Sequence, residues 1–275
     1  MSPLAAVLLV GLGVVVGAFG TIIGVGGGFI LVPALLLAYP DDEPAIITSI
    51  SLAVVFFNAL SGSLGYARLR RIDYRTGLTF ALATVPGAIV GAAATNWLPR
   101  RAFDLTFGPL LILVAIYLAF WGGAAKGGRL ASLRPNAQRT LTDSAGVTYG
   151  YSFNRELGIT ISFFVGFIAS FLGLGGGIIH VPVMVSLLNF PAHVAAATSH
   201  FILVFTALTA TAVHIVDGSL AEGLARMIAL AVGVVVGAQI GARLSGRLPA
   251  GVIVRLLAGA LFVVAIRLII AGASG

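Results

Sequence analysis

The sequence predicts an all-α integral membrane protein, with about eight membrane segments arranged in two homologous halves. Three observations support this fold class. Hydrophobic residues make up 59% of the 275 positions and charged residues only 9%, whereas soluble domains carry about a quarter charged residues. Apolar runs long enough to cross a bilayer follow one another along the chain, and one glycine-rich motif occurs twice. A surface this poor in charge is expected to face the lipid bilayer.

The net charge of +7 does not point to nucleic acid, because the basic residues lie in short clusters between apolar runs. Such clusters are typical of cytoplasmic loops in membrane proteins. The chain has no cysteine, which excludes disulfides, thiolate catalysis and cysteine-based metal sites. The apolar N-terminus lacks a basic n-region and continues into further apolar sequence, so we expect a first membrane segment there and no cleaved signal peptide. The expected location is a membrane of the bacterial inner-membrane type, and we expect no cofactor and no bound metal.

Eight apolar runs reach the length of about 20 residues that a spanning helix needs. They are 4–38, 45–67, 76–95, 102–121, 156–189, 194–216, 223–243 and 251–271. Residues 4–38 and 156–189 would each extend about 50 Å as one straight helix, well beyond a hydrocarbon core of about 30 Å. Both contain a cluster of glycines, so we expect each to be a helix broken by unwound backbone.

The substantial polar stretch, 122–155, separates the first four runs from the last four. Residues 140–142 and 147–153 are rich in β-branched and aromatic side chains and flank Asp143-Ser144-Ala145-Gly146. This pattern is typical of a β-hairpin, here on the membrane surface, and a disordered linker is the alternative.

An internal repeat relates the two halves. GAFGTIIGVGGGFILVPAL, from Gly17, aligns with GFIASFLGLGGGIIHVPVM, from Gly166, at an offset of 149. After one extra residue, Thr48-Ser49 aligns with Thr198-Ser199, and Gly87 with Gly237, at an offset of 150. We therefore divide the chain into a first membrane repeat (1–121), a polar linker (122–155) and a second membrane repeat (156–275).

The halves are inverted if each broken helix turns back at its glycines, and parallel if it passes through the bilayer. Inversion places 12 of the 16 basic residues on the cytoplasmic side and Asp41, Asp42, Glu43, Asp217 and Glu222 outside. Because cytoplasmic loops are rich in Lys and Arg, the charges favour inverted repeats over parallel ones.

The glycine clusters are the candidate substrate site. Unwound backbone is tolerated within a membrane where it lines a cavity, and inverted repeats with broken helices recur in transporters. The helix that follows each break presents free N–H groups and partial positive charge, which together can hold a small anion without a buried Lys or Arg. The glycines are Gly24, Gly26, Gly27, Gly28, Gly173, Gly175, Gly176 and Gly177. Close helix packing is the alternative role for them.

Other polar residues of the membrane segments complete the candidate site. The hydroxyls of Thr48, Ser49, Thr198 and Ser199 can donate to a bound anion, or else bond to their own helices. His200 and His180 lie beside the second Thr-Ser pair and the second glycine cluster, and are candidates for proton coupling. Asn58 and Gln239 are further candidates, for which joining neighbouring helices is the favoured role.

The doubled motif GVGGGFILVP (Gly24–Pro33) and GLGGGIIHVP (Gly173–Pro182), each followed by Thr-Ser, resembles the sulfite exporter TauE/SafE family of membrane permeases. The resemblance covers the chain apart from 122–155. It implies a secondary transporter that moves sulfite, sulfonates or related organosulfur anions across the inner membrane, often outward. His180 is not part of the family's motif.

Two other classes compete with an anion transporter. A cation or metal transporter would rely on the histidines, although the absence of a mid-membrane Asp or Glu disfavours it. An intramembrane protease would need a nucleophile such as Ser170 with a base, and no GxSxG elbow is present. We therefore expect a transporter and not an enzyme, with a small anion, protons and lipid as its partners and its oligomeric state left open.

Overall fold

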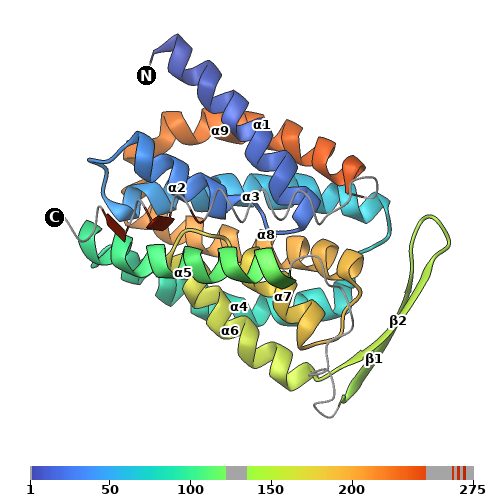
Figure 1. Cartoon of the computed structure of the whole chain (residues 1–275). Coiled ribbons are helices and arrows are strands. Elements are labelled where there is room, and N and C mark those ends of the chain that lie inside the picture. The colour runs from blue at the N-terminus through green and yellow to red at the C-terminus, as the bar shows by residue number, and fades with distance from the viewer. Residues whose placement is uncertain (1, 122–134, 246–261, 263–264, 267–268, 271–275) are drawn as a thin grey trace.

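The computed structural model describes residues 2–121, 135–245, 262, 265–266 and 269–270 (Figure 1). The eighth predicted segment, 251–271, and the start of the linker, 122–134, fall wholly or mostly outside the described residues. The helices are α1 (Pro3–Ile23), α2 (Gly28–Ala38), α3 (Pro44–Arg68), α4 (Tyr74–Thr95), α5 (Arg100–Trp121), α6 (Arg155–Phe171), α7 (Gly177–Ser186), α8 (Ala192–Val216) and α9 (Ser219–Leu244). The strands are β1 (Ala137–Thr142) and β2 (Thr148–Phe153).

Five helices in the described part of the chain are long and apolar enough to cross a membrane: α1, α3, α4, α8 and α9. The apolar helices α2 and α7 are too short to cross it alone. Large apolar side chains remain exposed on the outside of the bundle, among them Leu4, Leu82, Phe164 and Ile228. Lipid is the environment that suits such a surface, so the prediction of a multi-pass α-helical membrane protein is confirmed.

The break predicted in each long apolar segment is confirmed. Helix α1 is followed by Gly24, which has φ 83°, and α2 begins after Gly27, with φ 83°. In the second half, α6 and α7 are separated by five residues that include Gly175 and Gly176, with φ 80° and 91°. Only glycine adopts this left-handed region without steric cost, so the sequence fixes both breaks locally.

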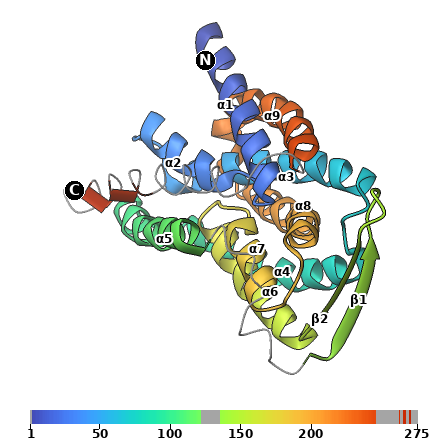
Figure 2. The same cartoon turned by 45° about the vertical axis from the view of Figure 1, so that its right-hand side comes forward.

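Two three-helix bundles pack side by side (Figure 2). One contains α1, α3 and α9, with α9 packed on both of the others. The second contains α4, α6 and α8, with α4 packed on both of the others. Helices α3 and α8 form the main contact between the bundles.

Glycines set the spacing within each bundle and show the direction of its helices. A methyl group placed on Gly233 would lie 2.1 Å from the Val10 carbonyl oxygen, and one on Gly241 would lie 2.4 Å from that of Ala18. The contacts advance together along α1 and α9, so these helices run in the same direction. Gly87 and Gly91 of α4 meet the Phe163 and Phe167 carbonyls of α6 in the same way.

The helices within each bundle are parallel, and the two bundles run in opposite directions. Ile50 lies against Gly223 and Ser61 bonds to Val235, so α3 runs parallel to α9. Between the bundles, Gly62 lies against His200 whereas Leu52 clusters with Ala210, so α3 and α8 are antiparallel. Because α1 and α3 run in the same direction, α2 must return the chain from the glycine cluster to the end where α3 begins.

The two ends of the bundle differ in charge. One end, called the basic end here, carries residues that include Arg68, Arg70, Arg71, Arg75 and Arg243 around the ends of α3 and α9. The other, called the acidic end, carries Asp41, Asp42 and Glu43 before α3, and Asp217 and Glu222 around the start of α9. This is the separation of loop charge that the inverted arrangement predicts.

The predicted β-hairpin is confirmed and is docked on the basic end. Strands β1 and β2 pair antiparallel, with Ala137 opposite Phe153. The Arg71 guanidinium donates to the Asp143 carboxylate at 3.1 Å. Burial alone would raise the pKa of Asp143, but hydrogen bonds from the Val147 and Ala145 amides and from Arg71 hold it below its ordinary value. The hairpin is thus tied to the α3–α4 loop.

Candidate substrate site at the paired glycine turns

The two glycine turns lie against each other where the two bundles meet. A methyl group placed on Gly28 would lie 2.6 Å from the Leu174 carbonyl oxygen, and one on Gly177 would lie 2.6 Å from that of Val25. These two contacts correspond to each other, since Gly28 aligns with Gly177, and Val25 with Leu174, at the offset of 149. The predicted proximity of the two clusters is therefore confirmed, at a depth near the middle of α3 and α8.

Each turn opens onto the N-terminus of a buried helix. The amide N–H groups of Gly28, Phe29, Gly177 and Ile178 have no hydrogen-bond acceptor among the described residues. These are the first amides of α2 and α7, which no helix can satisfy from within. Gly28, Phe29, Gly177 and Ile178 are themselves buried. The backbone thus presents four unpaired donors, and the partial positive charge of two helix ends, at one place.

Side chains of α3 hold both turns. Asn58 donates from Nδ2 to the Gly26 carbonyl at 2.7 Å and accepts at Oδ1 from the Thr21 hydroxyl at 2.9 Å. The Tyr66 hydroxyl donates to the Thr21 carbonyl at 2.5 Å. Ser51 donates to the Gly173 carbonyl of the other turn at 2.7 Å. Asn58 therefore binds the first glycine turn directly. The sequence favours a different role for it, the joining of neighbouring helices.

Of the two Thr-Ser pairs, Thr48 lies against Gly173 of the second turn, and the four hydroxyls differ in what they can still bind. Thr48 donates to the Pro44 carbonyl at 2.8 Å and Ser49 to that of Ile46 at 2.7 Å, both within their own helix. In the second half, the Thr198 hydroxyl accepts the Asp73 amide at 3.0 Å. The buried Ser199 hydroxyl has no hydrogen-bond partner among the described residues. In this conformation the Ser199 hydroxyl is free, and Thr198, which only accepts, still has its proton to donate.

The two candidate histidines are buried in different places. His200 lies between the bundles, with Nε2 3.3 Å from the Thr21 hydroxyl and its ring against the edge of Tyr66. His180 lies between α6 and α7, with Nε2 3.0 Å from the Ser162 hydroxyl. His200 therefore belongs to the surroundings of the first turn, whereas His180 joins two helices of the second half.

Gln239 lies away from the turns, on the contact between α3 and α9. It donates to the Ser61 carbonyl at 2.7 Å and accepts from Arg68 at 3.4 Å. Its role is therefore to join neighbouring helices, which is the role that the sequence favours for it.

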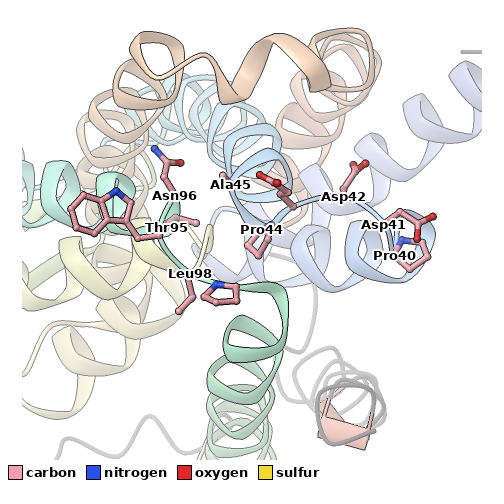
Figure 3. A pocket seen from close by; sticks show the side chains of 11 residues that line it. Pro40, Asp41, Asp42, Pro44, Ala45, Thr95, Asn96 and Leu98 are labelled. Atoms are coloured by element: carbon pink, nitrogen blue, oxygen red, sulfur yellow. The ribbon is translucent and has the colours of Figure 1, made fainter. Parts of the chain in front are cut away.

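Two cavities lie at the acidic end. One, of about 390 Å³, lies between the loops that precede α3 and α5 and is lined by Asp41, Asp42 and Asn96 among others (Figure 3). A more apolar cavity, of about 560 Å³, lies between α4 and α8 and includes Asn96 and Asp217 in its wall. Neither cavity is lined by a residue of the glycine turns, so neither reaches the turns in this conformation.

Sequence reasoning missed Thr21, Ser51 and Tyr66. Thr21 carried a weak signal, since it lies three residues before the first glycine cluster. Ser51 and Tyr66 carried none, because each acts on backbone that is distant in sequence. Only the packing of α3 against both turns reveals these two.

Comparisons with known proteins agree with the prediction of a membrane transporter. The family model described as "Sulfite exporter TauE/SafE" matches residues 9–268. A "Probable membrane transporter protein YunE" from Bacillus subtilis (strain 168) is 35% identical over 218 residues, which cover 77% of this chain and 79% of that protein. "Probable membrane transporter protein MJ0441" from Methanocaldococcus jannaschii is 24% identical over 206 residues, covering 73% of this chain and 69% of that protein. No solved structure matches the chain.

Proposed function

The chain belongs to the sulfite exporter TauE/SafE family, and from that premise we propose that it exports sulfite, a sulfonate or a related small organosulfur anion. The family and the relatives are membrane transporters, so the chain is a multi-pass transporter and not an enzyme. The family description mentions sulfite, and the backbone chemistry of the paired turns suits a small anion. Export would carry such an anion from the basic end to the acidic end.

The observation that carries the proposal is the set of four unpaired amides on two helix N-termini that meet. An oxyanion accepts hydrogen bonds from backbone N–H groups, and helix N-termini favour negative charge. Gly24, Gly26, Gly27, Gly173, Gly175 and Gly176 would give the backbone the shape to reach the anion, with Gly28 and Gly177 beginning the two helices. Ser199 and Thr198 would each add a hydroxyl proton, and Thr48 and Ser49 would do so once they release their present acceptors.

The proposed architecture is two inverted repeats, residues 1–121 and 156–275, joined by the polar linker. Three facts support it. Helices α1, α3 and α9 run opposite to α6, α8 and α4, their partners in the repeat. The contact of α1 with α9 corresponds to that of α6 with α4. The contacts of Gly28 and Gly177 also correspond, and an axis that relates the halves would pass between the two turns.

Alternating access would then be a movement of the two three-helix bundles against each other. Each bundle contains helices of both repeats, so the moving bodies would not be the repeats themselves. The contact between α3 and α8 is apolar, with Val55, Ala59, Leu203 and Ala207 buried in it. An apolar contact between rigid bundles can shift without breaking salt bridges, which suits a transporter that exposes its site to each side in turn.

The test is flux of radiolabelled sulfite by the purified full-length protein in proteoliposomes, beside a sulfonate and a divalent metal. Ser199→Ala removes one donor to a charged ligand, worth about 1.5–3 kcal/mol, and should weaken binding roughly ten- to a hundredfold. Gly176→Val should cost more, because a β-branched side chain disfavours the φ of 91° there.

Gly11→Val is the matched control, since a Cβ at Gly11 meets nothing within 4 Å. Parent-level flux by both site variants at equal expression would show that the site lies elsewhere. Transport of the metal, without sulfite or sulfonate, would support the cation transporter instead.

A further inference from the structure

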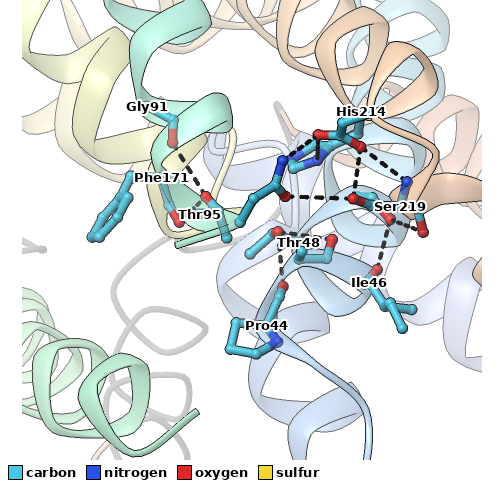
Figure 4. A network of polar contacts seen from close by, with 12 residues as sticks. Pro44, Ile46, Thr48, Gly91, Thr95, Phe171, His214 and Ser219 are labelled. Carbon is cyan, nitrogen blue, oxygen red and sulfur yellow. Dashed lines mark hydrogen bonds and ion pairs between the residues drawn. The ribbon is translucent and has the colours of Figure 1, made fainter. Parts of the chain in front are cut away.

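At the acidic end, a buried histidine faces a partly exposed carboxylate. His214, in the last turn of α8, is fully buried, and its Nδ1 lies 3.3 Å from Oδ2 of Asp217 (Figure 4). Neither ring nitrogen completes a hydrogen bond with any described residue. Buried polar groups are ordinarily hydrogen-bonded, so an imidazole left incomplete beside a carboxylate calls for an explanation beyond packing.

Asp217 connects this histidine to the outside. The carboxylate is partly exposed and lies in the wall of the cavity of about 560 Å³ between α4 and α8. Burial would raise the pKa of Asp217, but hydrogen bonds from Ser219 and Asn96 and the neighbouring His214 hold it below its ordinary value. Asp217 is therefore charged at neutral pH, and its charge opposes the cost that burial imposes on a proton on the imidazole beside it.

Polar groups continue from the pair toward the second glycine turn. The Ser219 hydroxyl donates to Asp217 at 2.6 Å, and the Ser219 carbonyl accepts from Ser49 at 3.4 Å. Thr48, the neighbour of Ser49, lies against Gly173. A change of charge at the pair therefore acts first on Ser219. Two contacts, from Ser219 to Ser49 and from Thr48 to Gly173, separate Ser219 from the proposed substrate site.

The described residues in contact with the pair are otherwise neutral. Asn96 faces it from α4, Ser219 from α9 and Ser49 from α3. Among the described residues, the other charged groups of this end are Asp41, Asp42 and Glu43 before α3, Glu222 and Arg226 on α9, and Arg101 on α5, with Arg226 bonded to Asp42. Within the described residues, Asp217 is the charged group in contact with His214, so the charge of this pair is set by one proton.

We propose that the His214–Asp217 pair is the proton-binding site that couples anion transport to the proton gradient. The proposal rests on the proposed function, and it assigns the coupling to His214 in place of His200 or His180. The first repeat has Leu64 and Ala67 at the aligned positions, so the pair has no counterpart at the basic end. Its proton would be taken up from the acidic end and would pass by the hydroxyls of Ser219 and Ser49 toward the substrate site, to be released when that site opens to the basic end. A proton taken up by the pair would loosen the hold of Asp217 on Asn96 and Ser219, which join α4 to α9, and so favour movement of one bundle against the other.

The alternative is a structural role, in which a histidine in the last turn of α8 complements the helix dipole. The experiment that separates the two roles measures sulfite counterflow and proton-driven sulfite accumulation in the same proteoliposomes. Counterflow exchanges labelled for unlabelled sulfite and needs no net proton movement. A gradient of about one pH unit should let the parent accumulate sulfite about tenfold per coupled proton. His214→Gln should keep counterflow within about threefold of the parent but reduce the accumulation ratio to about one.

The controls keep the outcomes distinct. His193→Gln changes an exposed histidine at the opposite end of α8 and should accumulate sulfite as the parent does. Asp217→Asn, which keeps the imidazole, should also lose accumulation, and it serves if His214→Gln fails to fold. Proton-driven accumulation by both variants would overturn the inference and leave the proposed function standing.

A parent that shows no sulfite counterflow would instead refute the substrate assignment. Titration of ¹⁵N-labelled histidines by NMR, in the parent and in His214→Gln, then tests the pair without any substrate. The inference fails if no histidine signal that changes with pH in the parent disappears in the variant.

Discussion

Substitution of Gly28 by alanine tests whether the two glycine turns are held in direct contact. A methyl group there would lie 2.6 Å from the Leu174 carbonyl oxygen and 2.8 Å from that of Gly173. Both neighbours are backbone atoms, so no side-chain rotation can relieve the overlap. Overpacking of this kind costs about 1–3 kcal/mol, and a rigid site should lie near the upper value. A loss of about 3 kcal/mol lowers the Tm by roughly 6–12 °C for a chain of this size.

The assay is thermal unfolding of the purified protein in detergent, with Gly11→Ala as the control. Gly11 lies in α1 and has open space where a Cβ would be, so alanine there should be neutral or stabilising by up to about 1 kcal/mol. The double variant Gly28→Ala/Gly177→Ala should lose less than the sum of the single losses, because turns pushed apart once make room for the second methyl group. If Gly28→Ala unfolds at the same temperature as Gly11→Ala, the turns do not touch as described.

Three further predictions follow from other contacts. Asn58→Leu should lower the free energy of unfolding by about 1–3 kcal/mol, because the buried Gly26 carbonyl loses its donor, and thermal unfolding would measure this. Because the pKa of Asp143 is depressed in the folded protein, its contribution to hairpin docking is present above about pH 4 and is lost as the pH falls through the depressed value. Limited proteolysis of the hairpin across this range should show the transition, and Asp143→Asn should be cleaved equally fast throughout. Cysteines placed at Arg70 and Ser219 should label from opposite sides of the membrane in intact cells, and labelling of both from one side would contradict inverted repeats.

The sequence predicted the parts of the fold that depend on local chemistry. Clustered glycines interrupt a helix because each can adopt a positive φ, so both breaks were predictable within a few residues. The hairpin was predictable in the same way, from β-branched and aromatic residues on either side of Asp143-Ser144-Ala145-Gly146. The proximity of the two turns needed one more step, the internal repeat, which implies that equivalent segments meet near an axis.

The side chains around the turns could not be predicted because they act across long sequence separations. Ser51 reaches the turn at Gly173 only because α3 crosses between the bundles. For Thr48 and Ser49 the sequence left two roles open, donation to a bound anion and donation to their own helix. In this conformation both hydroxyls donate to carbonyls of their own helix, as short polar side chains in helices often do. The composition of each bundle was also hidden, since a repeat in sequence does not reveal which helices of the two halves pack together.

The two turns are held from different helices, although their backbones correspond. The first is held from α3, through Asn58 on Gly26 and Tyr66 on Thr21. The second is held from both bundles, by Ser51 of α3 on Gly173 and by Thr95 of α4 on Phe171. The position that aligns with Asn58 in the second half is Leu208, which has no group to donate. Because α3 supplies a donor to each turn, a shift of α3 with its bundle would disturb both of them in the same step.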